Sequence, residues 1–300
     1  MRASTKKWLA AGIILVLLGG ILFSCVMFVL GWDFTKLATV QYETNTYVFE
    51  ESFSGISLQT DAADILFAFS EDGVCKVECY EAETERYSVS VRDGILCVEI
   101  SAESLRRYIG INFGSPTITV YLPKREYDSL SVRGSTGDIE IPQDFSFGKA
   151  DISLSTGNIR MENIAAGSLA LSVSTGQVNA SSVTCAGDLT VRVSTGEAYL
   201  ADVSCKNFLS SGNTGDLSLR NVIAAEAFTI MRTTGDVTFA GCDAAAISVE
   251  TDTGDVTGTL LSDKVFVTNT STGDVDVPSA AVGGPCTIRT STGDITMHIQ

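Results

Sequence analysis

The chain has 300 residues, 45% of them hydrophobic, and its 20 basic and 36 acidic residues give a formal net charge of −16. Proteins recognise nucleic acids and anionic membrane surfaces largely through Lys and Arg, so this balance argues against a nucleic-acid-binding protein and against a polybasic membrane-surface patch. One histidine and the lack of any CxxC pair among eight cysteines argue against a zinc site of the usual spacing.

The N-terminus is predicted to be a membrane anchor. Residues 1–7 form a short basic tail, and residues 8–32 follow without a single charge. A helix of this length crosses ~30 Å of hydrocarbon with some tilt, and Trp8 and Trp32 stand where interfacial aromatic residues belong. The positive-inside rule keeps the basic tail in the cytoplasm. We therefore expect a single-pass protein of the cell membrane with residues 33–300 outside the cell.

Two other interpretations of this segment stay open. A cleaved signal peptide would also have a basic start, but its apolar core would be shorter and would end in small residues. A lipoprotein signal would use Cys25, although Phe23 fits such a signal poorly and the chain stays apolar through Leu30. The length of the apolar run favours the anchor, with Cys25 as a small apolar residue inside it.

The region after the anchor changes in two steps. Residues 33–46 are a mixed, polar linker, and residues 47–125 contain short strands of period two between acidic or glycine turns. Asp93-Gly94 is a hairpin signal. Residues 60–65 resemble a degraded copy of the repeat that follows. These features predict that residues 47–125 are irregular β structure that begins the repeat array and caps its N-terminal end.

The strongest signal is a Thr-Gly-Asp unit that recurs nine times within residues 126–300. Its glycines stand 19 or 20 residues apart, at Gly137, Gly157, Gly176, Gly196, Gly215, Gly235, Gly254, Gly273 and Gly293. A constant period of this length is typical of stacked repeats. A βαβ unit needs thirty or more residues, so the predicted fold is an all-β parallel β-helix, a solenoid of about nine or more ~20-residue coils.

Apolar ladders identify the positions that face the core. They stand two residues after, seven before and five before each glycine, with polar residues between them, as expected for half-buried strands. A third ladder stands seven residues after glycine: Ile164, Val183, Val203, Val222, Cys242 and Leu261. Two residues break the pattern. Asp144 occupies the third ladder in the first coil, and Arg232 occupies a slot that Leu154, Val173 and Val193 fill in other coils.

An acidic or amide residue follows every repeat glycine. Five units in succession carry aspartate and are expected to form a column: Asp216, Asp236, Asp255, Asp274 and Asp294. Aspartate is a common turn residue, and neighbouring unit charges ~4.8 Å apart repel by only about 1 kcal/mol in water, so the column needs no cation. No cofactor is therefore expected. Calcium bound along the column is the alternative, although the Gly-Gly-x-Gly-x-Asp signature of calcium-binding solenoids is absent.

The cysteines outside the apolar run allow two interpretations. Cys75 and Cys79 lie on the same side of one strand, since they are four residues apart, and Cys97 lies on a neighbouring strand. Cys185 and Cys205 both stand nine residues after a repeat glycine, which stacks them in adjacent coils. Buried free thiols are favoured, and disulfides stay open.

No catalytic constellation is visible in the sequence. A single histidine leaves a Ser-His-Asp or Cys-His site almost nothing to use, and no P-loop, Rossmann fingerprint or zincin motif occurs. We therefore expect a protein that is not an enzyme, with no catalytic and no cofactor-binding residues.

Several of these features together resemble a known family. The N-terminal span, the Asp93-Gly94-Ile95-Leu96 stretch, the segment 118–123 and the repeated Ser-Thr-Gly-Asp-Ile unit are similar to the bacterial putative-adhesin family of β-strand repeats, also called domain of unknown function 4097. The resemblance covers residues 47–300. It implies an extracytoplasmic β-solenoid that is often membrane-tethered, and it supplies no catalytic residues.

The functional expectation is a membrane-tethered solenoid that binds an unknown surface or envelope ligand, in adhesion or in envelope sensing. A self-associating scaffold is the alternative, because the last coil reaches Gln300 without a capping segment and an uncapped end invites end-to-end pairing. A calcium-stabilised binding module is a third hypothesis.

Overall fold

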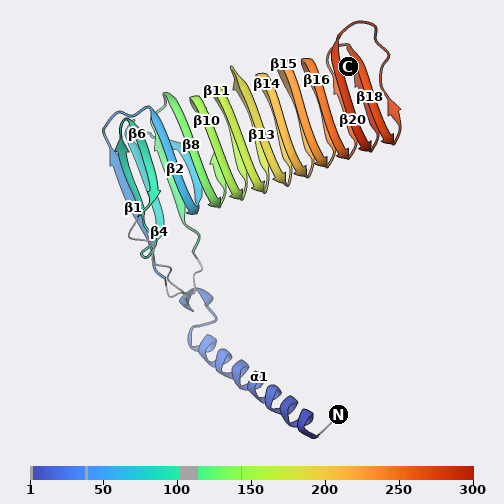
Figure 1. The fold of residues 1–300 in the computed structure, drawn as a ribbon. Helices are drawn as coiled ribbons and strands as arrows, with labels where there is room; N and C mark the ends of the chain where they lie inside the picture. The colour runs from blue at the N-terminus through green and yellow to red at the C-terminus, as the bar shows by residue number, and fades with distance from the viewer. Residues whose placement is uncertain (1–2, 38–39, 102–113, 143) are drawn as a thin grey trace.

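The computed structural model describes residues 3–37, 40–101, 114–142 and 144–300, which form one long helix followed by an all-β rod (Figure 1). Helix α1 spans Ala3–Val29. Its segment Lys7–Val29 has a mean hydropathy of 2.7 and is only 6% buried. This helix is long and apolar enough to cross a membrane, a test that a signal sequence would also pass. The short 3-10 helix η1, Phe34–Leu37, follows it.

The strands described by the structure belong to one continuous sheet that winds into a solenoid. They are β1 Tyr42–Phe49, β2 Gly55–Ala62, β3 Asp64–Phe69, β4 Cys75–Ala82, β5 Tyr87–Arg92, β6 Ile95–Ile100, β7 Thr117–Leu122, β8 Glu126–Thr136, β9 Ile139–Ile141, β10 Ser146–Thr156, β11 Ile159–Thr175, β12 Val178–Cys185, β13 Asp188–Thr195, β14 Ala198–Thr214, β15 Leu217–Thr234, β16 Val237–Thr253, β17 Val256–Leu260, β18 Lys264–Thr272, β19 Val275–Asp276, β20 Gly284–Thr292 and β21 Ile295–Ile299. Pairing between successive coils is parallel, so the predicted parallel solenoid is confirmed.

Each regular coil turns at three places. The first turn is the repeat glycine, with φ between 124° and 149°. The second lies six residues later and holds a residue with φ near 50–64°. Most of these residues are polar and none is β-branched, in keeping with the preferences of that conformation: Asn163, Ser182, Asp202, Asn221 and Gly241. The third turn includes the stacked glycines Gly148, Gly167 and Gly187. This second turn was not predicted from the sequence, although its polar and glycine residues recur at a fixed offset from the repeat glycine.

The apolar ladders line one continuous core, with two departures from expectation. Leu261 was expected to face inward, and this is wrong: it is exposed, and Leu260 pairs with Cys242 and fills the slot. The register shifts there because this coil has one residue fewer between its glycine and the turn. Asp144 is a break in the ladder, as predicted. It lies exposed beside Lys124, and Phe145 is the buried residue.

The degraded repeat at residues 60–65 forms a true coil. Ala62 pairs with Thr136, and the carbonyl oxygen of Ala63 lies against Gly137, as each repeat glycine lies against its neighbour. This coil, made by β2 and β3, lies between β6–β7 on one side and β8–β9 on the other. The first coil in the sequence is therefore not the outermost coil of the rod.

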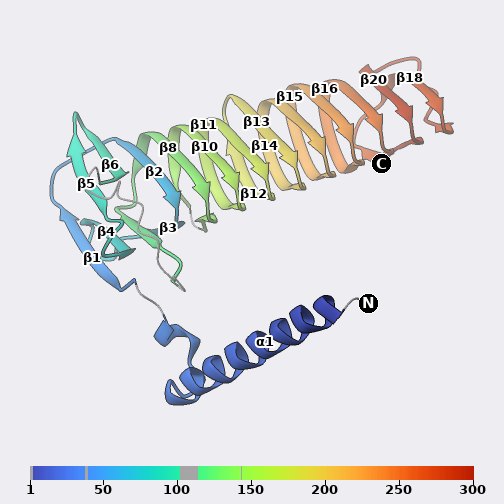
Figure 2. The same ribbon diagram turned by 60° about the horizontal axis from the view of Figure 1, so that its bottom comes forward.

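Antiparallel strands close the N-terminal end. Strand β5 pairs with β6, and β4 pairs with both β7 and β1 (Figure 2). The predicted hairpin is confirmed, because Asp93 and Gly94 connect β5 to β6 with φ of 51° and 72°. Strand β1 already begins at Tyr42, within the stretch interpreted as a linker.

The C-terminal end also departs from sequence order. Thr292 of β20 pairs with Thr253 of β16 and with Thr272 of β18, so the last coil of the chain lies between the two coils that precede it. Ile295 of β21 likewise pairs with Val256 and Val275. Both views show β18 outermost and β20 inside it (Figures 1 and 2). The expectation that the coil reaching Gln300 forms an uncapped end is therefore wrong: β18 and β19 form that end.

A buried ion pair bridges the inserted coil. Gly284 of β20 lies against the carbonyl oxygen of Ala245, where a side chain would collide. Lys264, on the far side of Gly284, is 3% exposed and reaches back to Asp243, with 2.6 Å between Nζ and Oδ1. Ser262 also contacts the Lys264 ammonium. The pair therefore spans the inserted coil and joins two coils that are not neighbours.

Disulfide trapping tests this coil order. Cysteines introduced in pairs at Thr253 and Thr292 are expected to cross-link in the oxidised protein, because these residues face each other in adjacent coils. The Thr253→Cys, Thr272→Cys pair is expected to stay reduced, because β20 separates the two positions. The Thr272→Cys, Thr292→Cys pair is the matched control, since these coils are adjacent in either order. Cross-linking of 253 to 272 but not to 292 would establish the sequential order instead.

Candidate functional site

The aspartate column is a hydrogen-bonded ladder along the first turn of the coils. Each carboxylate except that of Asp274, the last of the column, accepts the backbone N–H of the equivalent residue in the next coil. The donor and acceptor pairs are Asp236 to Asp216 (2.9 Å), Asp255 to Asp236 (2.8 Å), Asp294 to Asp255 (2.8 Å) and Asp274 to Asp294 (2.8 Å). The column exists as predicted, but Asp294 precedes Asp274 along it. Its carboxylates therefore have a structural role at the turn.

The same ladder extends toward the N-terminal end and is interrupted once. Asp64, Asp138 and Asn158 each accept the N–H of the next coil. No such bond occurs at Gln177 or Glu197 in the described chain, whose longer side chains instead contact each other. The ladder needs a short side chain with an oxygen on its γ-carbon. Among the described residues no group of three or more His, Cys, Asp or Glu side chains is arranged to hold a metal ion.

The cysteines are all free in the structure. The seven outside α1 are buried, and burial raises the pKa of Cys75, Cys79, Cys205 and Cys286 to about 12. At neutral pH these thiols are protonated, so they pack as small apolar side chains and are poor nucleophiles or metal ligands. The favoured interpretation, buried thiols, is confirmed by the structure.

Arg232 is the most unusual side chain of the core. It is 4% exposed, and its Nη2 donates to Ser210 Oγ at 3.0 Å. Its Nε and Nη1, and the buried Thr251 Oγ1 of the next coil, have no hydrogen-bond partner within the described residues. Burial lowers the pKa of the guanidinium, and Asp216 opposes the shift. A buried cation without a carboxylate partner lowers the free energy of unfolding. Arg232, which breaks the apolar ladder in the sequence, is therefore expected to destabilise its coil.

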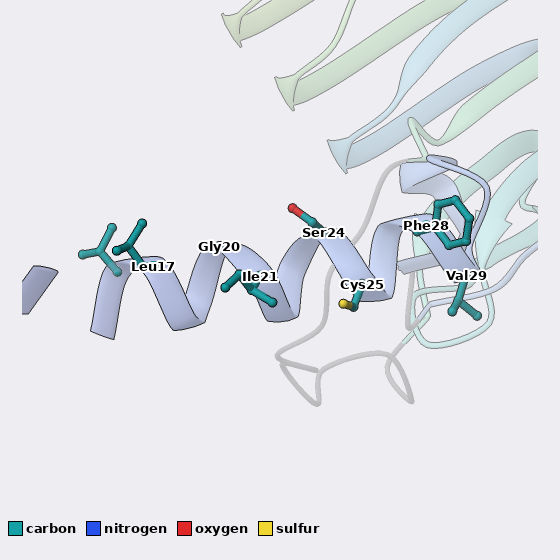
Figure 3. Close-up of a pocket in the computed structure, with 8 residues that line it drawn as sticks. Leu17, Gly20, Ile21, Ser24, Cys25, Phe28 and Val29 are labelled. Atoms are coloured by element: carbon teal, nitrogen blue, oxygen red, sulfur yellow. The ribbon is translucent and has the colours of Figure 1, made fainter. Parts of the chain in front are cut away.

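An apolar hollow lies along α1, with Gly20, Ser24 and Cys25 between larger side chains (Figure 3). Its lining has almost no polar surface, and the helix around it is exposed. Large apolar side chains exposed on all sides of a helix are what lipid contact requires. We interpret the hollow as a lipid-facing surface.

These features define the class of the protein: a parallel β-solenoid that follows an apolar N-terminal helix, with its polar ladders on the surface. The chain belongs to the Toastrack family, domain of unknown function 4097, whose model matches residues 53–187 and 184–300. The family resemblance seen in the sequence is thereby confirmed. No curated protein matches the chain.

Several solved bacterial structures are similar to this chain. A putative adhesin from Parabacteroides merdae is 13% identical, with a TM-score of 0.50, and the match covers 86% of this chain and 96% of that one. A putative adhesin from Bacteroides fragilis is 15% identical, with a TM-score of 0.45 over 86% and 97%. A putative lipid binding protein from Parabacteroides distasonis is 13% identical, with a TM-score of 0.41 over 85% and 97%. At these identities the similarity concerns the fold alone.

Substitutions at Asp236 separate the structural role of the column from a calcium site. Asp236→Ala is expected to lower the free energy of unfolding by ~1 kcal/mol, because it removes the acceptor of the Asp255 N–H. Asp236→Asn keeps that acceptor and is expected to be neutral or slightly stabilising, as Asn158 fills the same role in its own coil. Chemical denaturation in calcium and in chelator measures both. A calcium-dependent stability that both variants lose would instead support calcium along the column.

Proposed function

We propose that the protein is a single-pass membrane protein that displays its solenoid outside the cell to bind a surface or envelope ligand, without catalysis. Residues 8–32 would anchor it and residues 1–7 would stay in the cytoplasm. The observation that carries this proposal is the apolar helix, of which the described chain buries only 6%. An apolar surface of that size needs lipid around it.

The charge distribution supports the same arrangement. Residues 1–32 carry three basic residues and no acid, which leaves 17 basic against 36 acidic residues, or −19, for the rest. The basic tail satisfies the positive-inside rule, and the acidic rod would be repelled by anionic lipids. The sole histidine, His298, is exposed on β21, so general acid–base catalysis by histidine has no enclosed site in the described residues.

Cysteine labelling on intact cells tests the topology. Ser174→Cys lies on the exposed face of β11 and is expected to react with a membrane-impermeant maleimide. Ser4→Cys is expected to react only after permeabilisation. The unsubstituted chain supplies the background, since its cysteines outside the helix are buried. Labelling of Ser4→Cys but not Ser174→Cys on intact cells would contradict the proposed orientation. A mature chain that has lost the N-terminal position altogether would show a cleaved signal peptide.

A second candidate function, self-association, is favoured by the open end of the rod. Strand β18 pairs with β20 on one edge, and its other edge has no strand partner in the described residues. At this end Val265 and Val267 of β18 are 38% and 57% exposed, and Val275 of β19 is 45% exposed. The only charged residue of β18, Lys264, is buried. Natural edge strands are usually protected by charge, proline or a bulge, and β18 carries no exposed charge and no proline. We therefore place the end-to-end pairing of the alternative hypothesis at β18.

Sedimentation over a range of concentrations tests this pairing in the purified full-length protein. Wild type is expected to form dimers or larger species, and Val267→Lys is expected to shift the equilibrium toward monomer by placing a charge on the open edge. Ser174→Lys is the matched control, because it adds the same charge in the middle of the rod. A wild-type protein that stays monomeric at all concentrations would exclude self-association through β18.

A further inference from the structure

The surface above Arg232 is hollowed into a polar groove. The groove has a volume of about 330 Å³. It crosses four coils on the outer face of the strand segments that precede the repeat glycines. Its outer row is fixed by the ladder: Arg192 pairs with Ser211, Ser211 with Met231, and Met231 with Glu250. Ser194, Asn213, Thr233 and Asp252 form the second row. A groove of this size is at the lower end of what small-molecule sites offer.

Opposite charges occupy the two ends of the groove. Arg192 stands at one end, and Glu250 and Asp252 stand at the other. Three coil steps of ~4.8 Å separate Arg192 from Glu250, or about 14 Å, which is too far for an ion pair. None of the three makes a salt bridge to any described residue. Both ends therefore keep their charges available to a ligand, with hydroxyl and amide groups between them.

Arg232 adds a second positive charge beneath this groove. Gly212 forms part of the floor, and a Cβ at that position would overlap the Arg232 guanidinium. The side chain thus points back from its own coil toward Gly212 and Ser210, one step nearer to Arg192. The slot three residues before glycine holds Leu154, Val173 and Val193 in three preceding coils, whereas it holds Gly212 and Arg232 in the next two coils. The guanidinium therefore lies beneath the backbone of Gly212, with its Nε and Nη1 without a hydrogen-bond partner in the described residues.

We propose that this groove binds a short peptide with free ends, of about four residues, along the solenoid axis. Its carboxylate lies at the Arg192 and Arg232 end, and its ammonium group lies between Glu250 and Asp252. Four extended residues span ~13–14 Å, which matches the separation of the charged ends. The hydroxyl and amide groups of Ser211, Asn213 and Thr233 are placed to bind the peptide backbone. This inference rests on the proposed function, since it names the class of ligand that the displayed solenoid binds.

The destabilisation expected from the buried Arg232 guanidinium makes the role of this residue testable. A structural side chain is expected to stabilise the fold, whereas a buried charge without a partner destabilises it and is retained when function requires it. Arg232→Met keeps much of the volume and removes the charge. It is expected to raise the melting temperature of the protein and to weaken peptide binding at the same time. A residue with a purely structural role would not show both changes.

Calorimetry with the full chain in detergent micelles tests the proposal. Tetraalanine with free ends is expected to bind, and N-acetyl-tetraalanine amide is expected to bind at least tenfold more weakly. Arg192→Gln, Arg232→Met and the Glu250→Gln, Asp252→Asn double variant are each expected to weaken binding at least tenfold. Arg220→Gln is the matched control, because Arg220 lies outside the groove and its loss should leave affinity unchanged.

Three results would overturn the proposal: no binding of the free-ended peptide, equal binding of the capped peptide, or unchanged binding to Arg232→Met. Calorimetry on purified protein does not depend on membrane orientation. Comparison of the calorimetry with the labelling of intact cells therefore distinguishes a groove that binds no peptide from a solenoid that is not displayed outside the cell.

Discussion

The close stacking of the repeat glycines is the constraint on which the rest of the structure depends. At each first turn the backbone of one coil lies so near the carbonyl oxygen of the next that any Cβ would collide, and φ lies in the range that only glycine adopts without strain. This contact fixes the rotation of each coil relative to its neighbours. The apolar ladders, the aspartate ladder and the outer rows of the groove all come into register because the glycines do.

Much of this architecture follows from the sequence, because a strict period determines what each position within a coil must do. The turn glycine, the inward ladders, the aspartate column and the exceptional slot of Arg232 are all visible from the alignment of the repeats. Coil order is not visible. Every coil presents nearly the same ladder to both sides, so Thr253 could pair with Thr272 or with Thr292. In the observed order the Lys264–Asp243 pair spans the inserted coil and Gly284 lies where a side chain would collide, and these single residues carry no periodic signal.

The aspartate column and the groove could be predicted from the sequence to different degrees, because only the column follows the repeat. The aspartate column repeats and was found, but its purpose became clear only when each Oδ1 was seen to accept an N–H across coils. The residues that form the groove do not recur with the period of the coils. The groove lies where Gly212 and Arg232 occupy one slot in adjacent coils, and the ladder aligns Arg192, Ser211, Met231 and Glu250 along it. In a repeat protein the periodic residues specify the fold, so chemistry specific to one member is expected at such departures.

The out-of-order coils also change how the ends of the rod unfold. In a simple solenoid the last coil is a free tail, and its loss releases the full entropy of an untethered chain. Here the outermost coil, β18–β19, is joined to the rod through β17 on one side and β20 on the other. Its detachment releases only a closed loop, which gains less entropy than a tail. Strand β20 and the start of β21 are meanwhile held between two coils, as the first coil β2–β3 is at the opposite end. Insertion of both end coils therefore opposes fraying, even where an edge strand such as β18 is left open.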